Sequence, residues 1–199
     1  MKILIPILIV LFAIIFFPRS APPQTKTSSE PTPIPSPTPI PKFIPPIAEF
    51  KKRIVKKPFG LYITPATSPV QPEKFTGYHT GVDVEYGDVQ TDVPTVAIAD
   101  GLVIYSGWVS GYGGFLAILH TDYISTYSHL NPESLLPKNT KVLQGQTIGT
   151  LGRAYSHETD GERKHLHFGI IKGNKLDLRG YVQNEIEISL WLNPLNLYP

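Results

Sequence analysis

Short apolar stretches recur from residue 59 onward, and Gly, Asp, Asn or Pro interrupts them at close intervals. None of them has the i, i+3, i+4 spacing of apolar positions that an amphipathic helix needs. Alternating positions bounded by turn residues instead predict β-hairpins. We therefore expect an all-β fold, a small antiparallel β-sheet or barrel-sandwich, in which residues 95–99, 102–105, 115–119 and 124–127 are among the strands.

The first residues have a different pattern. Lys2 precedes an almost unbroken apolar run from Ile3 to Phe17, which is the layout of a secretory signal peptide or a short membrane anchor over residues 1–21. A helix of about 15 residues rises only ~22 Å, less than the roughly 30 Å hydrocarbon core, and this favours a signal peptide. Pro22 next to Ala21 disfavours cleavage. Both interpretations predict export to the cell envelope, either anchored by the N-terminus or secreted.

Residues 22–58 are expected to form a linker. The segment is rich in Pro, Thr and Ser, and the stretch from Pro31 to Pro41 has proline at nearly every second position, which predicts an extended polyproline-like spacer. It ends in the basic run Lys51–Lys57, which either contacts an anionic lipid or wall polymer or is simply solvated. The folded domain is then expected over residues 59–199.

Composition narrows the possible chemistry. The formal charge of +2 is too small to indicate a nucleic-acid-binding protein, which usually carries a strong basic stripe. The chain has no cysteine, which excludes disulfides and any zinc site with cysteine ligands. A metal site here would have to combine His with Asp or Glu.

The strand predicted over Lys164–Ile170 carries two histidines. Alternate residues of a strand face the same side, so His165 and His167 point together to one face while Leu166 and Phe168 point to the core. Two imidazoles at this spacing can both reach one metal ion. Taken alone, this pair fits two ordinary surface histidines better than a metal site.

A second segment, Gly77–Asp83, strengthens the metal hypothesis. His79 and Asp83 are four residues apart and would share a face, while Gly77 and Gly81 indicate tight backbone beside them. Together with the later histidines they provide a His, Asp, His set that leaves a fourth tetrahedral position open. An open position distinguishes catalytic from structural zinc.

The chain has three further histidines, His120, His129 and His157. His129 follows an alternating apolar segment and would share a face with Tyr127, so it either looks into the site or is a half-buried structural residue. We interpret His120 as structural because it continues a strand face before a Thr-Asp turn. His157 lies in a charged loop, where it either lines a groove or is solvated.

Several motifs in order give the domain a resemblance to the lysostaphin-type zinc endopeptidases, which cut peptidoglycan peptide bridges. The resemblance covers about residues 59–199, and its motifs are Gly77-Tyr78-His79-Thr80-Gly81-Val82-Asp83, Ala99-Asp100-Gly101-Leu102-Val103, Gly111-Tyr112-Gly113-Gly114, Ile118-Leu119-His120, Tyr127-Ser128-His129-Leu130, Gly145-Gln146-Thr147-Ile148-Gly149 and His165-Leu166-His167-Phe168.

The resemblance implies a small β-sheet fold with an open groove that holds one Zn²⁺. It implies that His79, Asp83 and His167 bind the ion and that His165 and His129 are catalytic. The implied substrate is a peptidoglycan peptide stem or crosslink, cut at an amide bond. With His165 acting as a neutral base, activity would fall below about pH 6.5, the ordinary histidine pKa.

The chain departs from the family in the loop before the last motif. Relatives commonly carry a Thr-Gly and Ser-Thr-Gly rich approach, whereas this chain has the charged segment 154–164. This loop is expected to form a groove wall, so substrate choice is in question more than chemistry.

Three alternatives remain open at this point. One is a non-catalytic module of the same fold that binds peptidoglycan or activates another hydrolase. A carrier domain of the biotinyl or lipoyl type is less compatible, because neither Lys138 nor Lys141 lies in the required hairpin setting. A different zinc amidase or D-Ala-D-Ala peptidase would share the ligand chemistry but not the motif order. The bond cut, the need for an activator and the oligomeric state stay undetermined.

Overall fold

The computed structural model describes residues 43–198. The predicted signal peptide or anchor and most of the predicted linker lie outside these residues. Between residues 43 and 198, no helix is long and apolar enough to cross a membrane. Every strand pair is antiparallel, as the sequence predicts.

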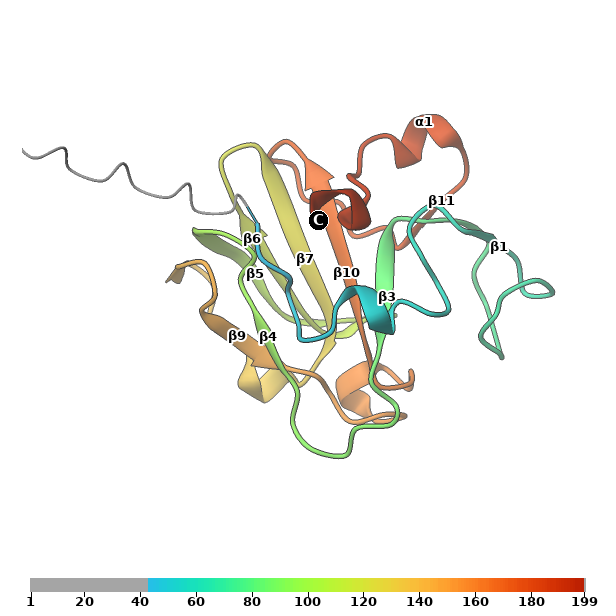
Figure 1. Cartoon of the computed structure of the whole chain (residues 1–199), viewed down its shortest axis with the longest axis horizontal. Coiled ribbons are helices and arrows are strands. Elements are labelled where there is room, and N and C mark those ends of the chain that lie inside the picture. Colours follow the sequence, from blue (N-terminus) through green and yellow to red (C-terminus); the bar gives the residue numbers. More distant parts are fainter. Residues whose placement is uncertain (1–42, 199) are drawn as a thin grey trace, which may run out of the picture. The chain divides into compact units, whose positions relative to one another are not determined.

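The largest sheet has six strands in the order β3-β10-β7-β6-β5-β8 (Figure 1). Their bounds are β3 Gly81–Glu85, β5 Gly101–Val109, β6 Gly113–Leu119, β7 Tyr123–Leu130, β8 Lys141–Val142 and β10 His165–Lys172. Strand β10, which carries the two predicted site histidines, lies between β3 and β7. The sheet therefore brings the 77–83 and 127–130 motifs to the two sides of the 165–168 motif.

Two small sheets and short helices complete the fold. A three-stranded sheet has the order β1-β2-β11, and β4 pairs with β9. The bounds are β1 Tyr62–Ile63, β2 Gly77–His79, β11 Tyr181–Val182, β4 Pro94–Val96 and β9 Thr147–Thr150. The helix α1 spans Glu185–Ile188, and short 3₁₀ helices span Lys51–Arg53, Pro132–Ser134, His157–Thr159 and Pro194–Leu197.

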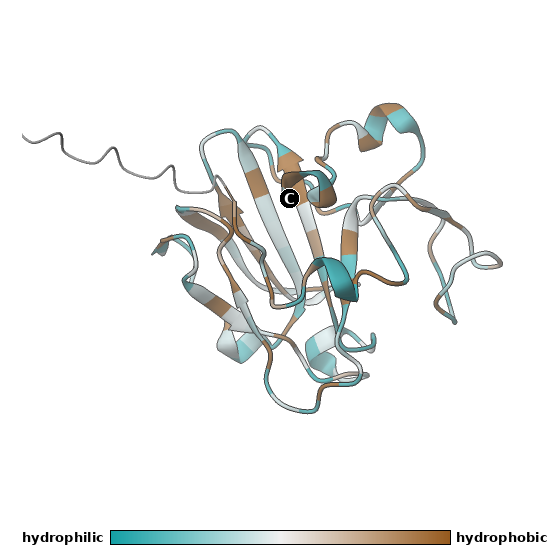
Figure 2. Ribbon diagram, in the orientation of Figure 1, coloured by the Kyte–Doolittle hydropathy of each residue, from teal (hydrophilic) through white to brown (hydrophobic). Residues whose placement is uncertain are grey.

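Both faces of the large sheet are covered. Leu166, Phe168 and Ile170 of β10 are fully buried in the main core, as the strand alternation predicts. A smaller cluster, which includes Phe115 and Trp191, covers the other face. Strand β7 is buried along its whole length, although Figure 2 shows it as largely pale rather than brown. Its polar side chains are thus interior groups, which hydropathy alone does not indicate.

The folded part begins before residue 59, so the predicted domain boundary is wrong in this respect. Phe50 is only 3% exposed and packs edge-on against Phe168 and Tyr198, with ring centroids 5.8 and 5.2 Å apart. Ile47 is buried in the same core. Figure 1 shows this segment crossing the face of β7 and β10. Isolated apolar residues between prolines gave no periodic signal, yet burying them stabilises the fold.

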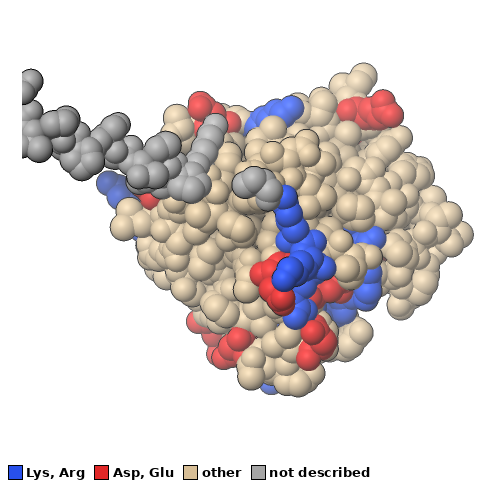
Figure 3. All heavy atoms as spheres, in the orientation of Figure 1, with Lys and Arg blue, Asp and Glu red and all other residues tan. Residues whose placement is uncertain are grey.

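The basic run 51–57 does not make a uniformly positive surface. Arg53 pairs with Glu49 and Asp88, and Lys56 lies 3.6 Å from Glu85. Figure 3 shows Lys and Arg interleaved with Asp and Glu on this face. Because opposite charges lie side by side, the run offers little net attraction to an anionic surface beyond a Debye length.

Candidate metal centre

The two predicted ligands of the 77–83 motif come from two strands rather than one. His79 ends β2 and Asp83 lies within β3, and between them the chain passes from one sheet to another at Thr80. Gly81 is required at this crossing, because a Cβ there would lie 2.5 Å from the Phe168 carbonyl oxygen and 3.0 Å from the His167 ring. The glycine thus lets β3 approach β10 closely enough for Asp83 to lie opposite His167.

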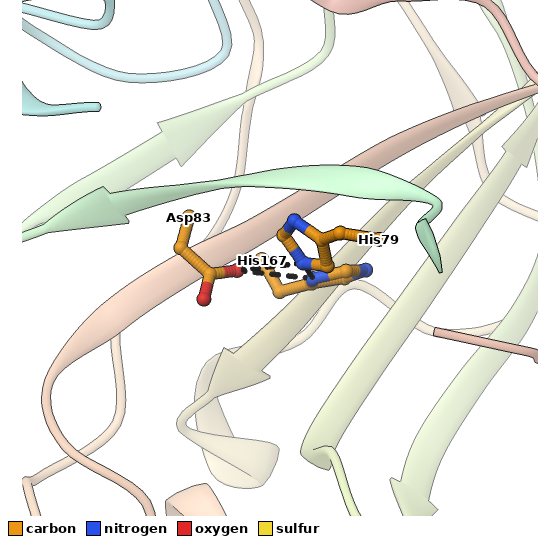
Figure 4. A group of neighbouring side chains, drawn as sticks. All are labelled: His79, Asp83 and His167. Atoms are coloured by element: carbon orange, nitrogen blue, oxygen red, sulfur yellow. Dashed lines mark hydrogen bonds and ion pairs between the residues drawn. The ribbon is translucent and has the colours of Figure 1, made fainter. Parts of the chain in front are cut away.

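Three potential ligand atoms converge in the buried site (Figure 4). His79 Nε2 lies 3.0 Å from His167 Nδ1 and 3.3 Å from Asp83 Oδ1, and His167 Nδ1 lies 3.1 Å from that same oxygen. Ligands at about 2.0–2.2 Å from a tetrahedral Zn²⁺ lie roughly 3.3–3.5 Å apart. The separations and the donor set of two imidazoles and one carboxylate therefore fit one zinc ion with little movement.

The segment just before residue 59 contacts two of these three residues. His79 Nδ1 lies 3.2 Å from the Pro58 carbonyl oxygen, which can only accept, so Nδ1 carries the proton and Nε2 is left free for an ion. The backbone N–H of Asp83 donates to the carbonyl of Lys57 at 3.0 Å. Such outer contacts fix the ring orientation of metal-binding histidines.

His165 lies beside the three ligand atoms. Its Nδ1 donates to the Arg163 carbonyl at 2.9 Å, so in the neutral ring Nε2 is an acceptor, and this atom lies 3.6 Å from Asp83 Oδ2. An acceptor nitrogen next to a metal position is what a general base requires.

His129 reaches the site through a β-bulge. In the ladder, Ser128 pairs with Phe115 and Leu130 with Gly114, so His129 is the extra residue, and its φ of 61° lies in the left-handed region. The bulge turns its ring to within 4.2 Å of the His165 ring centroid. Tyr127 instead points into the main core, so the expectation that the two residues share a face is wrong, although His129 does reach the site.

Burial lowers the pKa of His129, His165 and His167 and keeps these rings neutral, whereas neighbouring histidines keep Asp83 ionised. Burial, followed by His167, lowers the pKa of His129 to about 3. Burial and the neighbouring His129 hold the pKa of His165 well below its usual value. For Asp83, burial alone would raise the pKa, but His165 and His79 hold it well below the ordinary range. Near neutral pH Asp83 thus offers an anionic oxygen and His167 an uncharged ring nitrogen.

A groove of about 340 Å³ opens onto this cluster, and its lining includes Asp83, His129, His165 and His167. Loop residues Glu162 and Arg163 line it, which agrees with the expectation for segment 154–164. Additional lining side chains to which the sequence gave no role at the site are Lys57, Glu73, Tyr112 and Tyr181. Tyr112 lay within a quoted motif and Lys57 in the basic run, whereas Glu73 and Tyr181 carried no signal.

The two remaining histidines lie elsewhere. His120 is buried and is hydrogen-bonded to the Asp100 carbonyl oxygen and to Ser125 Oγ, as expected of a structural residue. His157 is exposed, and its ring stacks on Trp108 at 5.0 Å between centroids.

Sequence comparisons identify related proteins. The model of Peptidase family M23 matches residues 77–178. Relatives include the Murein hydrolase activator NlpD of Salmonella dublin, 35% identical over 109 residues, and that of Escherichia coli strain K12, 34% identical. The matches cover 53% of this chain and 26% of the length of each activator.

Structural comparison finds the same fold in solved proteins. The catalytic domain of lysostaphin from Staphylococcus simulans is similar with a TM-score of 0.52 and 20% identity, over 76% of this chain and 96% of that one. A chain of the SpoIIIAH and SpoIIQ complex gives a TM-score of 0.52 and 24% identity, over 78% and 99% of the two chains. At these identities the similarity establishes the all-β fold alone.

Proposed function

We propose that this chain, which belongs to peptidase family M23, is an exported zinc metalloendopeptidase that hydrolyses amide bonds in peptidoglycan peptide crosslinks. The observation that carries the proposal is the convergence of His79 Nε2, Asp83 Oδ1 and His167 Nδ1 within 3.0–3.3 Å of one another, beside two further histidines in an open groove. These three residues would hold the ion.

When bound, zinc would supply Lewis-acid polarisation of the scissile carbonyl and activation of a water molecule. His165 would take the water proton at Nε2, because its Nδ1 proton is already donated to the Arg163 carbonyl. It would then pass that proton to the leaving nitrogen.

The contacts and protonation state of His129 limit the role that it can have. Its Nδ1 donates to the Thr159 carbonyl at 3.2 Å, and its low pKa keeps the ring neutral, so Nε2 is an acceptor. A neutral acceptor can orient the attacking water but cannot donate to a developing oxyanion. We therefore assign His129 to water orientation.

The cell envelope is the proposed location. The apolar run near the N-terminus supports export. One relative, 34% identical over 96 residues, is named as a lipoprotein, YgeR of Escherichia coli. Peptidoglycan as the substrate is supported by the name of the murein hydrolase activators and by the fold shared with lysostaphin.

A second function, activation of another murein hydrolase without catalysis, is favoured by one observation, the 34–35% identity to the activators. The two functions differ in a testable way. Zinc would be measured by elemental analysis in the chain from residue 22 onward and in its Asp83→Ala variant, and the products formed from crosslinked peptidoglycan peptides by mass spectrometry.

About one zinc per chain, lost in Asp83→Ala, together with new peptide termini, is the expected result. Zinc binding without hydrolysis of any crosslinked peptide would favour the activator function. Failure to bind zinc at neutral pH would overturn the metallopeptidase proposal.

A further inference from the structure

Arg163 contacts the metal centre through its side chain. It lies in the loop that departs from the lysostaphin-type pattern, and its side chain is 9% exposed. Its Nη2 donates to Asp83 Oδ2 at 2.8 Å and to Glu85 Oε1 at 2.7 Å, while its Nε lies 3.0 Å from both oxygens of Glu85. Asp83 and Glu85 are alternate residues of β3, so one planar guanidinium can bind both carboxylates.

This contact gives the two carboxylate oxygens of Asp83 different partners. Oδ2 accepts from Arg163, while Oδ1 faces His79 and His167 at 3.3 and 3.1 Å. A carboxylate held in this way presents a single oxygen to an ion and is not free to rotate. Ligating carboxylates are commonly fixed by such outer hydrogen bonds, and losing them weakens metal binding.

The main chain of Arg163 acts on the other side of the site. Its carbonyl oxygen accepts the Nδ1 proton of His165 at 2.9 Å and so fixes the tautomer of that ring. The same residue therefore orients one proposed ligand with its side chain and the proposed base with its backbone.

Glu85 balances the charge of this arrangement. Its side chain is 13% exposed and shares the Arg163 guanidinium with Asp83. The Arg163–Glu85 pair is close to neutral as a unit, so Asp83 keeps a negative charge for a cation. Without Glu85, the positive charge of the guanidinium would repel a divalent ion bound to the other oxygen of the Asp83 carboxylate.

We propose that Arg163 is a positioning residue of the metal centre, one that restricts Asp83 to single-oxygen coordination and that Glu85 makes compatible with a bound cation. The inference rests on the proposed zinc site and adds a residue outside the motif set. The plainer interpretation is that the ion pair only anchors the loop 154–164, and this predicts no effect on metal affinity once the protein is folded.

The test compares zinc affinity, measured by competition with a chromophoric chelator, and the absorption spectrum of the cobalt(II) form. Arg163→Lys keeps the charge but loses the planar fork. Arg163→Gln combined with Glu85→Gln removes the fork without leaving Glu85 as an unpaired buried carboxylate, which protects folding. Arg153→Gln removes an arginine that directly precedes this loop and pairs with Glu158 within it, and it serves as the matched control.

We expect a zinc dissociation constant about 10–100-fold higher in Arg163→Lys and in the double variant than in the parent, with a changed cobalt spectrum. The control should match the parent in both. Folded variants that retain the parent's affinity and cobalt spectrum would overturn the role of Arg163. A parent that binds no zinc would instead count against the proposed function, so the two failures can be told apart.

Discussion

Replacing Phe50 by Ala tests whether the segment before residue 59 belongs to the fold. A phenylalanine buries about 150–250 Å², which at ~25 cal/mol per Å² gives an upper bound of about 4–6 kcal/mol. Phe50 is 3% exposed and makes edge-on contacts with two aromatic rings, so it approaches full burial. Measured costs of Phe→Ala in protein cores are about 3–5 kcal/mol, and we expect a loss of free energy of unfolding in that range.

The assay is urea unfolding of the metal-free chain, monitored by tryptophan fluorescence and circular dichroism. For a domain of this size, the loss corresponds to a fall in Tm of roughly 6–20 °C. Val55→Ala is the control, because Val55 is 69% exposed and its truncation should change the free energy by less than about 0.5 kcal/mol. A Phe50→Ala protein within ~1 kcal/mol of the parent would refute the packing argument, since core truncations cost more.

Three further predictions concern the site. His165→Ala should keep its zinc and lose about 10²–10⁴-fold in kcat, because only the proposed base is removed; full hydrolysis with zinc bound would contradict this. Since a low pKa keeps His165 neutral, kcat/KM should fall on the acidic side only below pH ~6.5. A fall at or above that pH, at constant zinc occupancy, would contradict a lowered pKa of His165. The pKa of His129 is lower in the folded than in the unfolded chain. The contribution of the neutral ring to the free energy of unfolding is therefore complete above pH ~6.5 and is lost as the pH falls toward 3, by about 1.4 kcal/mol per pH unit. Across that range, the free energy of unfolding of the metal-free chain should depend less steeply on pH in His129→Asn than in the parent, by the slope that corresponds to about one proton taken up on unfolding. An unchanged slope would argue against a neutral His129.

The strand pattern was sufficient to predict the antiparallel sheet and the placement of His165 and His167. Burial of Leu166 and Phe168 on one face requires apolar residues at alternate positions, so the amino-acid sequence alone shows the pattern. The orientation of His129 could not be predicted from the alternation, because a bulge adds one residue to the strand and reverses the alternation locally. The packing of Phe50 and the contact of Arg163 with Asp83 depend on chain separations of about a hundred residues, for which a single sequence carries no periodic signal.

Matched family positions begin at residue 77, whereas the carbonyl groups of Lys57 and Pro58 hold Asp83 and His79 from twenty residues earlier. The structural unit that supports the proposed metal site is therefore larger than the region that the family model matches. A chimaera that grafts residues 77–178 onto another protein would transfer the proposed ligands without these two supports and without Phe50. An engineered fusion should instead retain the chain from residue 43 onward to keep the imidazole of His79 oriented.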